Sequence, residues 1–161
     1  MRIRHLIAIL VAPWLLTAAL ANPYEMTLKN GLRIIVKEDR RAPTVAQMVW
    51  YRIGSMDEVD GASGVAHVLE HMMFKGTPNV GPGEFNKLVA AAGGRDNAFT
   101  SNDYTAYFQQ VPKERLAQMM QLEADRMRHL NVDAKEFEQE IKVVMEERRM
   151  RTDDNPQAKL F

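Results

Sequence analysis

Cysteine is absent from this sequence of 161 residues, and its absence excludes disulfide bonds and metal sites built on thiolates. A surplus of basic residues is also missing, because 21 lysines and arginines are matched by 21 aspartates and glutamates. The sequence therefore offers no excess positive charge to attract nucleic acid. Internal repeats and low-complexity tracts are missing as well. The apolar fraction of 46% can support the core of one domain.

Long apolar runs are limited to the N-terminus, where Leu6 to Leu20 forms a stretch of 15 residues. This stretch is short for a membrane span, and it follows the basic residues Arg2 and Arg4. Residues 19–21 read Ala-Leu-Ala, which fits an A-x-A cleavage site. We therefore predict a signal peptide over residues 1–21 and a periplasmic or secreted bacterial protein. An uncleaved membrane anchor is the alternative.

The most informative motif is H-x-x-E-H, formed by His67, Glu70 and His71. On a helix, residues four apart are separated by about 40°, so both imidazoles can reach one metal ion. Glu70 lies about 60° to the other side of His67, where a carboxylate can take a proton from water. This order is the reverse of H-E-x-x-H and is the inverzincin signature. Patterns of five residues also occur by chance, so a zinc site requires a third ligand.

The segment from Ser63 to Phe74 is predicted to be the helix that carries this motif, with Ser63 as its N-cap. Gly76 and Pro78 are predicted to end it. Its apolar residues cluster on the side of the helix opposite the motif and are expected to face the core. These residues are Val65, Leu69 and Met72.

A third ligand is predicted in a second helix, from Asp133 to Asp154, whose N-cap is Asp133. Glu140 and Glu147 fall on the same side as part of its apolar stripe, and buried carboxylates are costly unless they are paired or bound to metal. Glu146 points about 100° away, towards solvent. We therefore choose Glu147 as a ligand and Glu140 as its supporting partner. A solvated, salt-bridged helix is the alternative reading of this charged segment.

The sequence resembles the M16 family of zinc metallopeptidases, which includes pitrilysin, insulin-degrading enzyme and the mitochondrial processing peptidase. The similarity extends from about Tyr24 to Asp154, with several motifs in the expected order. The matching segments are Asn30-Gly31-Leu32 with Asp39 and Ala42-Pro43, residues 64–77, Asn97-Ala98-Phe99-Thr100 with Thr105 and Tyr107, and the Glu140/Glu147 pair.

The resemblance implies an α+β fold of the M16 (LuxS-like metallohydrolase) type, an antiparallel-rich mixed sheet covered by helices. It implies that Glu70 is catalytic and that one Zn²⁺ per chain is bound by His67, His71 and Glu147. Glu140 is expected to orient one of the histidine ligands. It further implies a substrate-binding strand made of Asn97, Ala98, Phe99 and Thr100. The implied activity is that of a zinc-dependent endopeptidase acting on peptides or unfolded proteins.

The sequence is shorter than a full M16 chain, which carries a second domain of similar fold. We therefore expect residues 22–161 to be a partial N-terminal catalytic domain, incomplete at its C-terminus. The expected partners are a substrate and a second M16-like domain or subunit, without nucleic acid and without stable membrane insertion after signal cleavage. A non-catalytic M16-like subunit or scaffold, binding peptides or a partner chain, is the alternative. A structural zinc domain is disfavoured because such sites rely on cysteine.

The remaining segments are predicted from hydrophobic periodicity and turn residues. The helix over residues 113–130 is amphipathic, and its expected core residues are Leu116, Met119, Met120, Leu122 and Met127. The other predicted elements are a hairpin over Tyr24–Val36 turning at Asn30-Gly31, strands over 45–53 and 99–111, and a short helix over 84–92.

Overall fold

The computed structural model describes residues 23–154. The predicted signal peptide lies outside the described residues. The chain divides into two compact units, with the boundary between Ala42 and Pro43. Across residues 23–154, none of the helices combines the length and the apolar character needed to cross a bilayer.

The first unit contains a β-hairpin made of β1 (Tyr24–Thr27) and β2 (Arg33–Val36), which pair antiparallel. The Gly31 N–H donates to the Leu28 carbonyl at 2.9 Å, and Gly31 has a φ of 87°. A short loop that ends with a residue in this left-handed conformation is a common hairpin connection. The predicted hairpin and its glycine turn are therefore confirmed.

The second unit is built on a sheet of three strands, β3 (Thr44–Tyr51), β4 (Arg95–Thr100) and β5 (Thr105–Pro112), in the order β3-β5-β4. Every strand pair in the described part of the chain is antiparallel. Every second side chain of β3 is half-buried, as expected for a sheet with one covered face. The predicted α+β class with an antiparallel-rich sheet is therefore confirmed.

One predicted strand is two strands in the structure. The sequence predicts a largely continuous strand from Phe99 to Val111, but the chain turns back between Ser101 and Tyr104. The Ser101 N–H donates to the Tyr104 carbonyl at 2.8 Å and closes this turn. Ser, Asn and Asp are turn-forming residues, and their signal here is hidden between two apolar segments. The turn leaves β4 at the edge of the sheet, paired only with β5 among the described strands.

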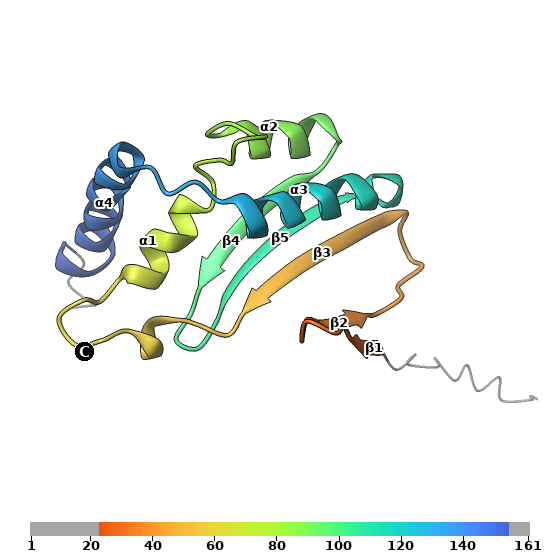
Figure 1. The fold of residues 1–161 in the computed structure, drawn as a ribbon, viewed down its shortest axis with the longest axis horizontal. Coiled ribbons are helices and arrows are strands. Elements are labelled where there is room, and N and C mark those ends of the chain that lie inside the picture. The colour runs from red at the N-terminus through yellow and green to blue at the C-terminus, as the bar shows by residue number, and fades with distance from the viewer. Residues whose placement is uncertain (1–22, 155–161) are drawn as a thin grey trace, which may run out of the picture. The chain divides into compact units, whose positions relative to one another are not determined.

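Helices cover one face of the sheet (Figure 1). These are α1 (Val65–Met72), α2 (Glu84–Ala91) and α3 (Leu116–His129). The fourth helix, α4 (Ala134–Arg148), packs against α1 and continues into a π-helical turn, η3 (Arg149–Asp153). Two short 3₁₀ turns, η1 (Ser55–Asp57) and η2 (Lys113–Arg115), precede α1 and α3. The central core cluster consists of Val80, Phe85, Val89, Ala92, Val111 and Met119.

Helix α3 buries two charged residues that its apolar pattern does not predict. Of the five expected core residues, Met120 and Met127 are exposed, whereas Glu123 and Arg126 are only 2% exposed. Arg126 Nη2 pairs with Glu123 Oε2 at 2.6 Å, and Gln109 Nε2 donates to the same carboxylate at 3.0 Å. The guanidinium also lies over three aromatic rings, those of Phe74, Phe85 and Tyr107. Pairing and cation–π contacts together make this burial tolerable.

Candidate metal centre

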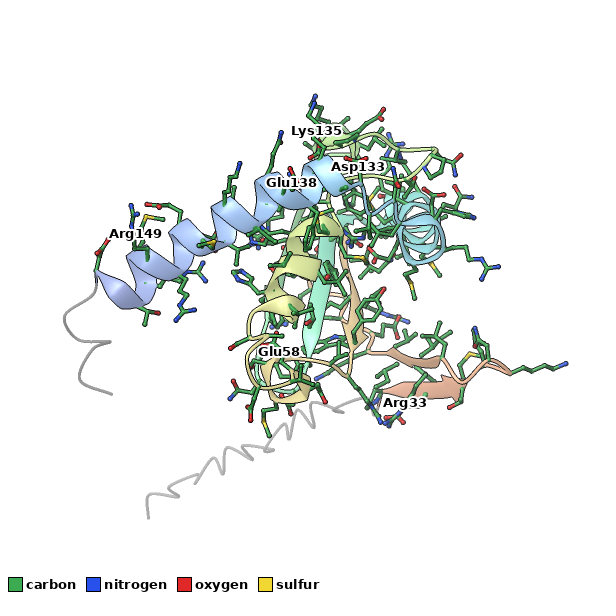
Figure 2. The ribbon with its side chains drawn as sticks, turned by 60° about the vertical axis from the view of Figure 1, so that its left-hand side comes forward. Arg33, Glu58, Asp133, Lys135, Glu138 and Arg149 are labelled. Atoms are coloured by element: carbon green, nitrogen blue, oxygen red, sulfur yellow. The ribbon has the colours of Figure 1, made fainter. Side chains whose placement is uncertain are left out.

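Helix α1 begins one residue later than the sequence predicts. Gly64, not Ser63, precedes the first helical residue, and Gly64 has a left-handed φ of 97°. The cap comes from the preceding loop, where the Glu58 carboxylate accepts from the N–H groups of Gly64 at 2.7 Å and Ala66 at 2.8 Å. Figure 2 shows Glu58 in this loop. A carboxylate satisfies the free N–H groups at a helix start and suits the positive end of its dipole.

The apolar side of α1 does not face the core as predicted. Met72 is buried, but Val65 is 58% exposed and Leu69 is 44% exposed. These two side chains line an open groove of about 720 Å³ between α1 and α4, together with Ile141 and Val144. His67 lines the same groove, so the apolar and motif sides of α1 are less separated than the helical wheel predicts. Of the motif residues, Glu70 approaches β4, where it contacts Thr100, whereas His67 and His71 face α4.

Helix α4 begins where the sequence predicts. The Asp133 side chain accepts from the backbone N–H groups of Lys135 at 2.9 Å and Glu136 at 3.1 Å, which confirms it as the N-cap (Figure 2). Glu136 stands three residues after Asp133, the position from which a Glu side chain can cap the N-cap backbone in return, but this bond is not formed. Its carboxylate instead lies 3.6 Å from the ammonium of Lys75, which follows α1. Glu136 therefore pairs with a residue that follows α1 instead of with the start of its own helix.

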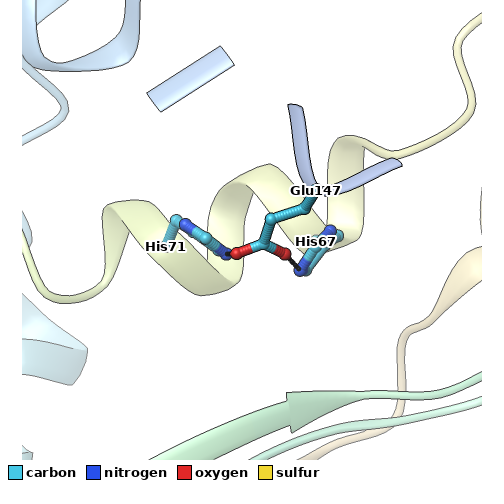
Figure 3. Close-up of side chains that lie close together, drawn as sticks. All are labelled: His67, His71 and Glu147. Atoms are coloured by element: carbon cyan, nitrogen blue, oxygen red, sulfur yellow. Dashed lines mark ion pairs between the residues drawn. The ribbon is translucent and has the colours of Figure 1, made fainter. Parts of the chain in front are cut away.

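The structure brings His67, His71 and Glu147 together from α1 and α4. His67 Nε2 lies 3.6 Å from Glu147 Oε2, and His71 Nε2 lies 3.9 Å from Glu147 Oε1. One potential ligand atom from each residue lies within 4.8 Å of the other two. Figure 3 shows the Glu147 carboxylate between the two imidazoles. Residues 76 and 80 positions apart in the sequence thus meet at one point.

The donor atoms of this cluster fit a divalent metal ion. Glu147 Oε2 is buried and accepts no hydrogen bond from the described residues, although Arg151 Nη2 lies 3.3 Å away. A buried carboxylate oxygen without a hydrogen bond is costly, and coordination by a cation would satisfy it. Two imidazole nitrogens and one carboxylate oxygen form a ligand set typical of catalytic zinc. Arg151 lies one helical turn beyond Glu147, and the sequence reasoning did not identify it.

Glu140 contacts the ring nitrogen of His71 that does not face Glu147. His71 Nδ1 lies 2.9 Å from Glu140 Oε2, and a carboxylate can only accept, so this imidazole nitrogen carries the proton. The opposite nitrogen, Nε2, is then free to bind a metal ion. Burial raises the pKa of Glu140, but hydrogen bonds from Lys75 and His71 outweigh this effect and hold the pKa below its ordinary value. Lys75, one turn after His71, was not singled out from the sequence.

Glu70 faces the end of strand β4. Its Oε2 accepts a hydrogen bond from the hydroxyl of Thr100, the last residue of that strand. Buried Tyr107 lies nearby on β5. Burial raises the pKa of Tyr107, Arg126 opposes this rise and Glu70 adds to it, so the phenol stays neutral at ordinary pH. The hydrogen bond from Thr100 therefore joins the Glu70 carboxylate of α1 to the sheet.

Comparisons with known proteins identify the family to which the chain is related. Residues 33–161 match the Insulinase family, peptidase family M16. A zinc protease of Helicobacter pylori, PqqE, is 43% identical over 137 residues, covering 84% of this chain and 31% of the relative. The crystal structure of a Helicobacter pylori protease superimposes with a TM-score of 0.83 at 43% identity, covering 86% of this chain and 34% of the other.

The structure of pitrilysin also superimposes, with a TM-score of 0.67 at 25% identity, over 74% of this chain and 13% of pitrilysin. This chain spans about a third of the length of its curated relative from Helicobacter pylori. The sequence match, the fold and the zinc protease relative all lead to one conclusion. The chain belongs to the M16 family of peptidases and corresponds to its N-terminal domain.

Proposed function

We propose that this chain carries the catalytic centre of a zinc-dependent endopeptidase with an inverted H-x-x-E-H site. The observation that carries the proposal is the convergence of two imidazoles and one carboxylate from α1 and α4 to within 4.8 Å of one another. Three protein ligands leave one position open, as in catalytic zinc sites, whereas structural sites are closed by four. The zinc protease relative from Helicobacter pylori supports the same metal.

In this proposal each polar residue of the site has a separate role. His67, His71 and Glu147 would hold the metal, and Glu140 would orient the His71 imidazole through Nδ1. Bound zinc would supply Lewis acidity towards water and the peptide carbonyl. Glu70 would accept a proton from the attacking water and deliver it to the leaving amine.

The edge strand β4 is the proposed site of substrate binding. An extended peptide can add to a free sheet edge through backbone hydrogen bonds, which require little of its sequence. Because side chains alternate along a strand, Asn97 and Phe99 point to one face of the sheet, and Ala98 and Thr100 point to the other. The Ala98 N–H donates a hydrogen bond to the side-chain oxygen Oδ1 of Asn97 at 2.9 Å. A peptide that uses this donor would have to displace the Asn97 amide.

Substrate, partner and location complete the proposal. The substrates are peptides or unfolded proteins, and a second M16-like domain or subunit would contribute to gripping them. The length of the Helicobacter pylori relative, about three times this chain, supports a larger assembly. A periplasmic or secreted location, with a membrane anchor as the alternative, rests on the sequence of residues 1–21 alone.

The decisive test is cleavage of a quenched peptide by the full gene product, with and without a chelator. Glu70→Gln should retain bound zinc but lower kcat by at least about 10²-fold, because it removes the proton acceptor. Glu138→Gln, at an exposed position of α4, is the matched control and should behave as wild type.

Each result of this test has a clear reading. Chelator-sensitive cleavage that Glu70→Gln abolishes supports the peptidase. Zinc binding without cleavage by the wild type would favour the non-catalytic subunit. Full cleavage by zinc-loaded Glu70→Gln would remove Glu70 from its proposed role.

A further inference from the structure

A single hydroxyl group connects the sheet to the carboxylate of Glu70. The Thr100 Oγ1–H donates to Glu70 Oε2, and the two residues lie 30 positions apart in the sequence. Within residues 23–154, Thr100 is the one side chain that hydrogen-bonds this carboxylate. A glutamate side chain has several rotatable bonds, so the direction of its carboxylate depends on such contacts.

The hydroxyl of Thr100 is itself held in place. Thr100 pairs with Thr105 across the β4–β5 ladder, next to the turn closed by Ser101 and Tyr104. The buried Thr105 hydroxyl lies 3.4 Å from Thr100 Oγ1 and donates to the Ile53 carbonyl at 3.0 Å. A β-branched side chain on a strand also has restricted rotation about χ1. The donor therefore belongs to the rigid sheet, whereas the acceptor belongs to a helix.

We propose that Thr100 is a positioning residue that directs the Glu70 carboxylate towards the metal centre. The inference rests on the proposed function, in which Glu70 transfers the proton. It also changes the role predicted for Thr100 from the sequence, because the hydroxyl is used within the protein and only its backbone remains for a substrate strand. Displacements of about 1 Å in a catalytic group can lower a rate by about 10²-fold.

A purely structural role for this hydrogen bond makes a different prediction. If Thr100 only joined β4 to α1, its loss would lower stability and leave turnover by the folded enzyme unchanged. If Thr100 positions Glu70, turnover falls although the metal ligands, the fold and substrate binding are intact. The separation of kcat from KM and from zinc content therefore distinguishes the two roles.

The experiment compares Thr100→Val with Thr100→Ser in the full gene product. Valine matches threonine in shape but lacks the hydroxyl, and serine keeps the hydroxyl. We expect Thr100→Val to lower kcat by roughly 10- to 100-fold, with wild-type zinc content and little change in KM. Thr100→Ser should recover most of kcat. If the valine variant fails to fold, Thr100→Ala replaces it in the same comparison with serine.

A second variant pair and a structural measurement complete the test. In the Glu70→Gln background, Thr100→Val should cause little further loss, because the group that it positions is already missing. Crystals of Thr100→Val should show the Glu70 carboxylate in a new rotamer. Wild-type kcat in folded Thr100→Val, while Glu70→Gln is inactive, would overturn this inference alone. Full activity of Glu70→Gln would overturn the proposed function instead.

Discussion

At the scale of single residues, Glu147 and Glu146 illustrate how one helical step separates two neighbouring carboxylates. Glu147 lies against both histidines, with one buried oxygen that accepts no hydrogen bond among the described residues. Glu146 instead pairs with Arg149 on the exposed side of the helix, at 3.0 Å. Helical geometry predicts this difference in direction, and the structure agrees with it.

The first prediction at this scale concerns metal affinity. Glu147→Gln removes a charged ligand, so we expect zinc affinity to fall by more than the roughly 10- to 100-fold that is typical for loss of an outer-shell partner. Zinc content after dialysis and competition with a chromogenic chelator measure the change. Glu146→Gln is the matched control, since it alters the adjacent carboxylate without facing the histidines. Equal zinc content in both variants would contradict the assignment of Glu147 as a ligand.

Three contacts of the site could not be predicted from the sequence. Lys75, Thr100 and Arg151 contact Glu140, Glu70 and Glu147, respectively. The first and third lie one helical turn from a site residue, but lysine and arginine at such positions are usually solvated. The contact of Thr100 crosses from a strand to a helix, and no local pattern encodes it. The candidate metal ligands could be predicted, because their spacing has a chemical reason and matches a known family.

At the scale of elements, helix boundaries were predictable where the cap is local. Asp133 caps α4 from the adjacent residue, as predicted. Glu58 caps α1 from six residues before Gly64, and sequence reasoning chose Ser63 instead. Helix α3 shows the same limit, because Arg126 pairs with Glu123 of the same helix but is covered by aromatic rings from outside it. Periodicity identifies a helix, but tertiary contacts decide which of its polar residues are inside.

Asp125 of helix α3 accepts hydrogen bonds from the loop that follows α1. It accepts from Thr77 Oγ1 at 2.5 Å and Asn79 Nδ2 at 2.6 Å, and it lies 3.0 Å from His129 Nδ1. The hydrogen bond from Thr77 makes the largest contribution to lowering the pKa of Asp125 below its ordinary value of 3.8, followed by the bond from Asn79. Its ionised form is therefore favoured by the folded protein.

The prediction for this element is a stability difference that depends on pH. A carboxyl whose pKa is lower in the folded state contributes stability above its unfolded pKa and loses it as pH falls through the folded pKa. Asp125→Asn should therefore be less stable than wild type at pH 6, and the gap should narrow as pH falls below 3.8. Urea unfolding from pH 6 to pH 3 measures both proteins. Asp60→Asn, at an exposed position, is the control; a gap that is constant over this range would contradict the prediction.

At the scale of the whole molecule, the α+β class and most of its elements were predictable from periodicity and turn residues. The burial of particular faces was not. Val65 and Leu69 line an open groove although they lie on the apolar side of α1. Trp50 on β3 is also exposed, at 53%, in an aromatic cluster with Phe99 and Tyr104. Exposed apolar surfaces of this kind are typical of interaction sites, which agrees with the proposed second domain or subunit.

Helix α4 depends on α1 for its attachment. Among the described elements, its main packing partners are α1 and its own continuation η3, rather than the strands. The distances from the Glu147 carboxylate oxygens to His67 Nε2 and His71 Nε2, 3.6 and 3.9 Å, are long, and the groove between the helices is open. Weak packing of this kind favours local opening without global unfolding. A metal ion held by both helices would oppose that opening.

The final prediction is that zinc stabilises the fold and protects α4 in particular. A ligand at 100 times its Kd adds about 2.7 kcal/mol to the free energy of unfolding, which for a domain of this size raises Tm on the order of 10 °C. Hydrogen exchange should slow over residues 134–148 more than over β5. Glu70→Gln should keep both effects, because Glu70 is not a proposed ligand, whereas His67→Ala should lose them. A Tm shift that survives in His67→Ala, or a shift of the same size with magnesium, would show that zinc does not act by joining α1 to α4.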